Sequence, residues 1–315
     1  MELPFEPMLL ERAPRPFADG RWLYQVKWDG VRNLALVEDG RVRHWSRRLR
    51  DRTALYPELA GGLAAALGPG RTVLDGEIVV LKDGKPSFGA VLERDVAARP
   101  PDQRKLQALP AVFMVFDLLE HGGEELYRRP MEERLERLRS ALAPADHWQV
   151  IASFPGDSGP DLFKATGEAS MEGVVAKRLG SGYAPGTRSQ DWLKIKHRRR
   201  MLAVICGYTV PVGRPGGLLL GAYRGDRLRY IGRVGSGITG ETLALLKANL
   251  PTGPCPFHRE PNLQDRFAGP PGPVVWTRPV LTVQVEYSEW TEAEKLRDPV
   301  LVGFSTEPPE SAQGP

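Results

Sequence analysis

The chain has 315 residues, of which 41% are hydrophobic and 26% charged, a composition typical of a water-soluble globular protein with room for two domains. No apolar run approaches the length of a membrane span, and the acidic first seven residues lack the pattern of a signal peptide, so we expect a cytoplasmic protein. The net charge is +4, and 33 of the 43 basic residues are arginines, which permits nucleic-acid binding without establishing it. Cys206 and Cys255 have no metal-binding spacing and are expected to be free structural thiols.

The first two thirds of the chain mix strand and helix patterns. Residues 1–20 contain four prolines and are expected to be extended. Apolar alternation or short apolar runs predict strands over 21–26, 34–45, 73–81, 111–119, 150–153, 173–178 and 191–196. Apolar residues at helical spacing predict helices over 53–67, 86–98, 130–143 and 162–170. Asp39-Gly40 is a hairpin signal that bends the second strand range, and a further turn is expected at 82–85.

The pattern changes after the basic run at 194–200. Strands are predicted over 202–210, 217–223, 227–234 and 280–287, with one helix over 241–248 and a surface loop over 259–273. Short strands with one helix are typical of a small barrel, most often the oligonucleotide-binding (OB) fold. We therefore expect an α+β protein: a mixed domain with antiparallel sheets over 1–198, an all-β OB-fold domain over 199–306, and a disordered tail over 307–315.

A single lysine stands at the end of the first predicted strand. Lys27 is the only lysine among the first eighty residues, and it lies between Val26 and Trp28, before the turn residues Asp29-Gly30. Because burial disfavours the charged form, a desolvated lysine can become a nucleophile near neutral pH. On this stretch alone, a surface lysine before an ordinary turn is an equal alternative.

Charged residues at other strand positions could form an anion site with Lys27. Lys194 and Lys196 are two residues apart on a predicted strand and so share a face, where a nucleotide polyphosphate would separate them. The alternative is a solvated basic edge that protects the strand from aggregation. Glu77 and Glu172 each begin an apolar run, where a carboxylate can bind a ribose hydroxyl or a divalent cation, although surface glutamates are common.

Phe116 and Asp117 lie within an apolar strand pattern. Phe116 could stack on a base or simply pack in the core. Asp117 is the one charged residue of that run, and a buried carboxylate needs a partner or a metal.

Taken together, these stretches resemble the covalent nucleotidyltransferases, which include DNA ligases, RNA ligases and mRNA capping enzymes. Within that superfamily the chain resembles the ATP-dependent DNA ligase module of the bacterial ligase D type, over about residues 5–303. The motifs that carry the resemblance are Lys27-x-Asp29-Gly30-x-Arg32, Ser46-Arg47, Asp75-Gly76-Glu77, Phe116-Asp117, Glu172-Gly173-Val174-Val175-x-Lys177, Ser181-Gly182-Tyr183, Trp192-Leu193-Lys194-x-Lys196, Ile231-Gly232-Arg233-Val234-Gly235 and Val285-Glu286-Tyr287.

The resemblance implies sealing of 5′-phosphate/3′-hydroxyl nicks or ends in DNA. Lys27 would attack the α-phosphate of ATP, AMP would pass to the 5′-phosphate, and the 3′-hydroxyl would displace AMP. The cofactors implied are ATP and Mg²⁺ or Mn²⁺. The implied partners are nicked or broken double-stranded DNA, a Ku-like end-binding protein and separate polymerase and phosphoesterase modules, with no membrane. We expect a monomer in the nucleoid that acts in non-homologous end joining.

The resemblance also implies roles for single residues. Lys27 would be the catalytic nucleophile and Asp29 would orient it. The remaining roles, by similarity to the family, are adenine recognition by Gln25 and stacking by Phe116, ribose contacts by Arg32 and Glu77, nick-phosphate binding by Arg47, metal binding by Glu172, and nucleotide-phosphate binding by Lys194 and Lys196.

Two segments depart from the family pattern. Arg48-Leu49 stands where the family has Asn-Gly, and because leucine resists the positive φ that glycine accepts, a different loop path is expected beside Arg47. The chain also has Gly303-Phe304-Ser305-Thr306-Glu307-Pro308 in place of the family's Gly-Leu-Arg-x-Asp-Lys-like segment, whose cations act on the leaving pyrophosphate. One lost contact of that kind costs roughly 10²–10³ in rate, so we expect slow self-adenylation but near-normal sealing of a pre-adenylated nick.

Two other functions remain open from the sequence. An RNA ligase or capping-type nucleotidyltransferase would share the core motifs but not the ligase-like barrel motifs. A DNA-binding scaffold with impaired self-adenylation would fit the missing terminal cations but not the retention of the other motif residues.

Overall fold

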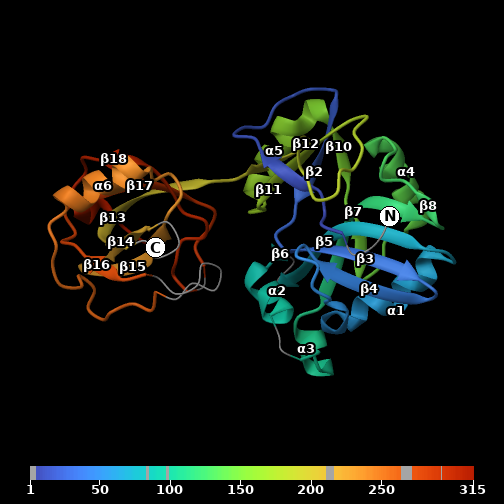
Figure 1. Cartoon of the computed structure of the whole chain (residues 1–315), viewed down its shortest axis with the longest axis horizontal. Helices are drawn as coiled ribbons and strands as arrows, with labels where there is room; N and C mark the ends of the chain where they lie inside the picture. The colour runs from blue at the N-terminus through green and yellow to red at the C-terminus, as the bar shows by residue number, and fades with distance from the viewer. Residues whose placement is uncertain (1–4, 83–84, 97–98, 211–215, 264–271, 292) are drawn as a thin grey trace. The chain divides into compact units, whose positions relative to one another are not determined.

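The computed structural model describes residues 5–82, 85–96, 99–210, 216–263, 272–291 and 293–315. The chain divides into two compact units, residues 1–197 and 198–315, which are coloured from blue to red along the chain in Figure 1. The domain boundary expected after residue 198 lies one residue from this division. Within the described ranges, no helix is both long enough and apolar enough to cross a membrane.

The first unit contains a seven-stranded sheet with helices packed on it (Figure 1). Its strands follow the order β4-β3-β5-β7-β8, with β6 beside β5 and β9 beside β7, and all pairs are antiparallel except β7–β9. The strands are β3 (Val31–Glu38), β4 (Arg41–Ser46), β5 (Thr72–Lys82), β6 (Lys85–Pro86), β7 (Ala111–His121), β8 (Glu124–Glu125) and β9 (Trp148–Val150); the helices of this part are η1 (Thr53–Leu55), α1 (Pro57–Leu67), α2 (Phe88–Asp95), α3 (Gln103–Ala108) and α4 (Met131–Ala141).

Helices α1 and α4 close the core on one side of this sheet. Leucines four residues apart in α1, Leu59, Leu63 and Leu67, are all buried on one face, as the sequence spacing predicts. Leu135 and Leu138 of α4 belong to the same core cluster. The opposite face of β3 and β5 is therefore left for other segments and for the pocket described below.

The second sheet of the first unit has five strands in the order β1-β12-β11-β2-β10. They are β1 (Leu9–Arg12), β2 (Trp22–Lys27), β10 (Ser153–Pro155), β11 (Gly173–Arg178) and β12 (Arg188–Lys196), flanked by η2 (Gly156–Ser158) and α5 (Gly159–Glu168). Tyr24, Val174 and Ile195 form an apolar cluster with Leu162 and Phe163 of α5. Because side chains alternate along a strand, Gln25 and Lys27 project from the other face.

In its described residues, the second unit is an antiparallel sheet accompanied by the helix α6. Its strands are β13 (Arg199–Thr209), β14 (Leu218–Arg224), β15 (Arg227–Val234), β16 (Val274–Trp276), β17 (Thr282–Tyr287) and β18 (Val300–Ser305), with α6 (Gly240–Asn249) and η3 (Pro309–Ser311). The order is β15-β14-β13-β17-β18, with β16 beside β13. A bridge between Ser236, just after β15, and Val300 of β18 joins the two ends of this order, as closure of a small barrel requires. The predicted α+β fold class, with a mixed unit followed by an all-β unit, is confirmed.

Several predicted elements need correction. The single strand predicted over 150–153 is wrong, because Trp148–Val150 joins one sheet and Ser153–Pro155 joins the other. Between them Ile151 is buried and its N–H donates to the Val115 carbonyl, so the chain changes sheets there.

Strands β1, β16 and β18 were not predicted, since β1 lies in a proline-rich stretch and the others are short or weakly patterned. The turn predicted at 82–85 and the loop predicted at 259–273 include residues 83–84 and 264–271, which lie outside the described ranges, as do residues 97–98 of the predicted second helix.

The disordered tail predicted over 307–315 is also wrong. The backbone N–H of Tyr223 in β14 donates to the Ala312 carbonyl at 2.7 Å, and Gly314 N–H donates to the Tyr223 carbonyl at 2.8 Å. Ala312 is fully buried against the barrel. Hydrogen bonds to the backbone of Tyr223 in β14 thus hold residues 312–314 in place, although their composition alone suggested disorder.

Candidate active site

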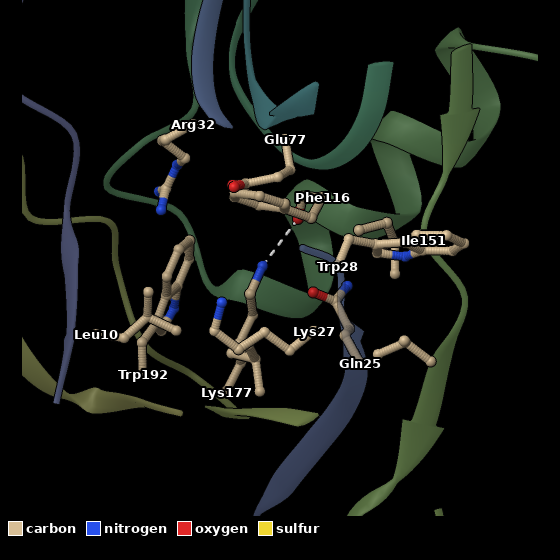
Figure 2. A pocket seen from close by; sticks show the side chains of 12 residues that line it. Leu10, Gln25, Lys27, Trp28, Arg32, Glu77, Phe116, Ile151, Lys177 and Trp192 are labelled. Carbon is tan, nitrogen blue, oxygen red and sulfur yellow. Dashed lines mark hydrogen bonds between the residues drawn. The ribbon is translucent and has the colours of Figure 1, made fainter. Parts of the chain in front are cut away.

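One pocket of the first unit brings together residues from both sheets (Figure 2). Lys27 lies at the end of β2, beside the turn that leads to β3, as the Asp29-Gly30 signal predicted. Five residues singled out from the sequence line the pocket: Gln25, Lys27, Arg32, Glu77 and Phe116. Residues that line it without a predicted role are Leu10, Val26, Trp28, Ile151, Val175, Lys177 and Trp192.

Lys27 is held in an ion triad at the edge of this pocket. Its Nζ lies 2.6 Å from Glu172 Oε2, and Lys196 Nζ lies 2.6 Å from Glu172 Oε1. Burial alone would lower the pKa of Lys27, but the charges of Glu172, Glu77 and Asp29 outweigh it and raise the pKa. The nucleophile candidate is therefore a protonated amine anchored by Glu172, and it must lose a proton before it can attack phosphorus.

Glu77 is a second carboxylate of the pocket, and its environment differs from that of Glu172. Burial raises the pKa of Glu77 to about 7, and Lys27 and Arg32 offset only part of this effect. The pKa of Glu172 is lowered, because Lys27 and Lys196 overcome the effect of its burial. At neutral pH Glu172 therefore stays ionised, whereas Glu77 is partly protonated.

Arg32 is fixed by a ring of hydrogen bonds that the sequence did not reveal. Its Nε and Nη2 each donate to the buried Asp75 carboxylate at 2.6 Å, and Tyr183 Oη donates to the same carboxylate at 2.7 Å. The backbone N–H of Met8 donates to Tyr183 Oη at 3.0 Å, and the Met8 carbonyl accepts from Arg32 Nη2 at 3.3 Å. The segment before β1 therefore joins β3, β5 and the loop before β12 around one guanidinium.

Aromatic rings and a buried lysine form one wall of the pocket. Phe116 and Trp192 pack edge to face with ring centroids 6.0 Å apart, and the Arg32 guanidinium lies 4.6 Å from the Phe116 centroid. Lys177 Nζ lies 4.0 Å from the Trp192 ring and donates to the Phe116 carbonyl at 2.9 Å, the dashed line in Figure 2. Burial lowers the pKa of Lys177 to about 7. Alternation along β11 was the signal available for it, because Val175 and Lys177 must share the face of Gln25 and Lys27.

Gln25 is almost fully buried, and its amide orientation is set by a neighbouring strand. Its Nε2 donates to Ser153 Oγ of β10 at 3.0 Å, and Figure 2 shows the amide at the pocket margin. The amide oxygen remains as an acceptor on the pocket side, which suits an exocyclic amino group of a base.

Lys194, Lys196 and Arg47 are not among the residues that line the pocket. The register of β11 and β12 places Lys194 opposite Val175 and Lys196 opposite Gly173, so the two lysines share a face as predicted. Burial lowers the pKa of Lys194, and the nearby cations Arg188, Lys196, Lys27 and Arg47 lower it further. This concentration of positive charge around Lys194 favours a polyanionic ligand.

The turn beside Arg47 corrects one expectation. Leu49 adopts the positive φ of 56° that the family's glycine would accept, so the leucine does not divert the chain as expected. Its N–H donates to the Ser46 carbonyl at 2.9 Å, and the Arg50 N–H donates to Ser46 Oγ at 3.2 Å. The turn is therefore kept at the cost of strain in Leu49.

The pocket offers a donor set suited to a divalent cation that is shared with phosphates. The described residues contain no cluster of three or more His, Cys, Asp or Glu side chains that could hold a metal by themselves. The two carboxylate oxygens of Glu172 contact Lys27 and Lys196, and the negative charge of Glu172 contributes to the raised pKa of Glu77. Mg²⁺ commonly binds one or two carboxylates and completes its shell with water and substrate phosphates, so these residues fit such an ion.

Comparison with known proteins agrees with this geometry. Residues 7–196 match the family described as ATP dependent DNA ligase domain, and residues 212–307 match the ATP dependent DNA ligase C terminal region. The chain belongs to the ATP-dependent DNA ligase family. The resemblance inferred from the motifs, and with it the expected class of enzyme, is confirmed.

Individual relatives place the chain with ligase D. A Pseudomonas aeruginosa protein described as multifunctional non-homologous end joining protein LigD is 37% identical over 96% of this chain and 35% of its own length. The corresponding Mycobacterium tuberculosis LigD is 36% identical over 88% of this chain and 35% of its own length. A solved structure described as mycobacterial DNA ligase D complexed with ATP and MES is 34% identical, covers 99% of this chain and 98% of that chain, and has a TM-score of 0.56. The chain thus spans about a third of the length of these curated relatives.

Proposed function

We propose that this chain seals 5′-phosphate/3′-hydroxyl nicks or ends in DNA through an AMP intermediate on Lys27. The observation that carries the proposal is the ion triad: the Lys27 amine lines the pocket and lies 2.6 Å from Glu172, whose other oxygen lies 2.6 Å from Lys196. In the first step Lys27 Nζ releases a proton to solvent and forms a bond to the α-phosphorus; the bond to the bridging oxygen breaks as pyrophosphate leaves, and a second proton leaves the nitrogen. Negative charge grows on the phosphates during this step, so the cations Lys194 and Lys196 are placed to stabilise it.

The remaining pocket residues suit the nucleoside. The guanidinium of Arg32, fixed by Asp75, is directed at the ribose together with Glu77. Phe116 offers an aromatic face for adenine, and the Gln25 amide oxygen can accept from the adenine amino group. Glu172 would hold Mg²⁺ or Mn²⁺ with the substrate phosphates, and such an ion would supply electrophilic assistance at phosphorus.

Arg47 is proposed to bind the 5′-phosphate at the nick. Its side chain is exposed, and its charge is one of those that lower the pKa of Lys194, which supports a role for both residues in binding phosphates. AMP would pass to that phosphate, and the 3′-hydroxyl would then attack and release AMP. The LigD relatives are described as non-homologous end joining proteins, so we infer that this chain acts in that repair pathway, as a monomer beside a Ku-like protein and separate polymerase and phosphoesterase modules.

Self-adenylation is predicted to be slow relative to sealing. The end of β18 and the two residues after it, Ser305, Thr306 and Glu307, contain no cation, and Glu307 N–H donates to Ser305 Oγ at 3.2 Å. Without cations on this segment, the charge of the leaving pyrophosphate is less well compensated. Single-turnover assays of the two steps should give slow transfer of AMP from ATP and fast sealing of pre-adenylated nicks; equal rates would contradict the reasoning.

A nick-sealing assay tests the proposed function. The full chain, ATP and magnesium should convert a nicked DNA duplex with a 5′-phosphate to a sealed strand, and omission of ATP should stop the reaction. A parallel substrate with an RNA 3′ strand discriminates an RNA-joining enzyme. Binding of DNA without sealing, even of a pre-adenylated nick, would favour a DNA-binding scaffold and refute the proposal.

A further inference from the structure

The strand β4 and the turn after it contain a dense group of arginines. Residues 41–52 include six, and Arg41, Arg43, Arg47, Arg48 and Arg50 are exposed. Arg52 pairs with Asp95 at 3.4 Å, whereas the other five form no ion pair with any described carboxylate. Five unpaired guanidinium groups on one short stretch repel one another, so an anion is the ligand that suits them.

The register of the sheet shows which way the arginines of β4 point. Leu36 lies opposite Arg43 and Glu38 lies opposite Arg41, and residues directly opposite in an antiparallel pair share a face. Arg32 belongs to the same face by alternation along β3, and it lies opposite Glu77 of β5. Arg41 and Arg43 therefore project from the face that also presents Arg32 and Glu77 to the pocket.

That face continues as a hollow toward the β3–β4 hairpin. Leu36, Glu38, Asp39, Arg41 and Arg43 line it. The Glu38 carboxylate is 3.6 Å from Arg71, which offsets its charge. The Arg43 guanidinium lies 5.3 Å from the Trp45 ring centroid, which limits its freedom. Apart from Asp39 at the turn, the uncompensated charges that line this hollow are positive.

The spacing relates the hollow to the proposed nick site. Ser46, the last residue of β4, lies opposite Asn33, the residue next to Arg32, and Arg47 follows Ser46 in the turn that leads to Asp51. Strand β4 rises about 3.4 Å per residue from Arg41 to Ser46, so Arg47, which follows its end, lies about 17–20 Å from Arg41. At about 3.4 Å per nucleotide along one strand of a duplex, this corresponds to about six base pairs.

We propose that Arg41 and Arg43 bind the phosphate backbone of duplex DNA about six base pairs from the nick. This proposal rests on the proposed function, which places the nick at Arg47. Guanidinium groups bind phosphate oxygens in pairs, and a rounded duplex suits a concave, positively charged surface. Asp39 lies at the far end of this surface and weakens binding by repulsion.

The test compares two double variants of the full chain that remove the same charge. Arg41→Gln/Arg43→Gln removes the proposed contacts, and Arg104→Gln/Arg139→Gln removes two exposed arginines of α3 and α4 that also lack a described ion pair. Binding of a nicked DNA duplex is measured by fluorescence anisotropy over a range of salt concentrations. The slope of log K against log[salt] should become shallower by about 1.8 for the first variant, because each phosphate contact contributes about 0.9. The second variant should keep the wild-type slope.

Two further measurements locate the contact. The difference between wild type and Arg41→Gln/Arg43→Gln should vanish when one duplex arm is trimmed to about four base pairs, too short to reach the hollow. Asp39→Asn, which retains a residue type that tolerates the φ of 50° at this turn, should tighten binding. Equal slopes for the two double variants, or a difference that persists on both trimmed arms, would overturn the proposal. Incorporation of AMP from ATP should be normal in both double variants, and its absence in wild type would instead contradict the proposed function.

Discussion

Tyr183→Phe isolates the hydrogen-bond ring that fixes Arg32. The change removes one hydroxyl and leaves the aromatic ring, which packs against Trp192 at a centroid distance of 5.5 Å. Asp75 loses the hydrogen bond of 2.7 Å from Tyr183 but keeps both bonds from Arg32. The Met8 N–H loses its acceptor, so the segment before β1 is released on that side.

The expected magnitude follows from these contacts. A buried hydrogen bond to a charged group contributes about 1.5–3 kcal/mol and a neutral one about 1 kcal/mol, so the variant should lose about 2–4 kcal/mol of unfolding free energy. Arg32 is proposed to contact the ribose equally before and during reaction. Loosening it should therefore raise KM for ATP by about 5–10-fold and leave the maximal rate of self-adenylation within about threefold of wild type.

Tyr24→Phe is the matched control. Tyr24 is also fully buried, donates to the Phe17 carbonyl at 2.9 Å and accepts from the Phe17 N–H at 3.1 Å, but it faces the α5 side of its sheet. Its loss should cost about 1–3 kcal/mol, because both bonds are neutral, and KM for ATP should not change. Denaturant unfolding and the ATP dependence of self-adenylation measure the two quantities. An unchanged KM in Tyr183→Phe, or an equal rise in Tyr24→Phe, would refute the positioning role.

Two further predictions concern pH and backbone strain. Between the ordinary pKa of 4.5 and the raised pKa of about 7, folded Glu77 holds a proton that the unfolded chain has lost, so it destabilises the first unit progressively as pH rises through this window. Between pH 5 and 7.5 the wild type should lose up to about 3 kcal/mol of unfolding free energy that Glu77→Gln keeps, as measured by urea unfolding at the two pH values. Equal losses in wild type and variant would contradict the raised pKa of Glu77. At Leu49, with φ of 56°, the glycine variant should be more stable than the alanine variant by about 1 kcal/mol in the same assay, since only alanine retains the strain; equal stabilities would show that the turn is unstrained.

Local sequence patterns predicted the strands that carry the site but not its cross-links. Alternation and the Asp29-Gly30 turn placed Lys27 at a strand end, and spacing placed Lys194 and Lys196 on one face, as the structure has them. The partner of Asp117 could not be chosen from sequence, because a buried carboxylate is satisfied equally by a metal or a cation. In the fold it pairs with Arg134 of α4, at 2.8 and 2.9 Å, with both side chains fully buried.

The ring around Arg32 could not be predicted for a related reason. Its members, Met8, Arg32, Asp75 and Tyr183, come from four separate parts of the chain, and no local spacing relates them. Asp75 and Glu77 are two residues apart and share a face of β5, but only Asp75 bonds to Arg32. Burial and register decide between them, and both are tertiary properties.

Peptide mapping of the adenylated protein tests the central claim most directly. The full chain is incubated with ATP and magnesium, digested and analysed by mass spectrometry, beside Lys27→Arg, which keeps a positive charge next to Glu172. The account predicts AMP on the peptide that contains Lys27 and no AMP on any peptide of the variant. AMP on another lysine, such as the low-pKa Lys177, or equal labelling of the variant, would contradict it.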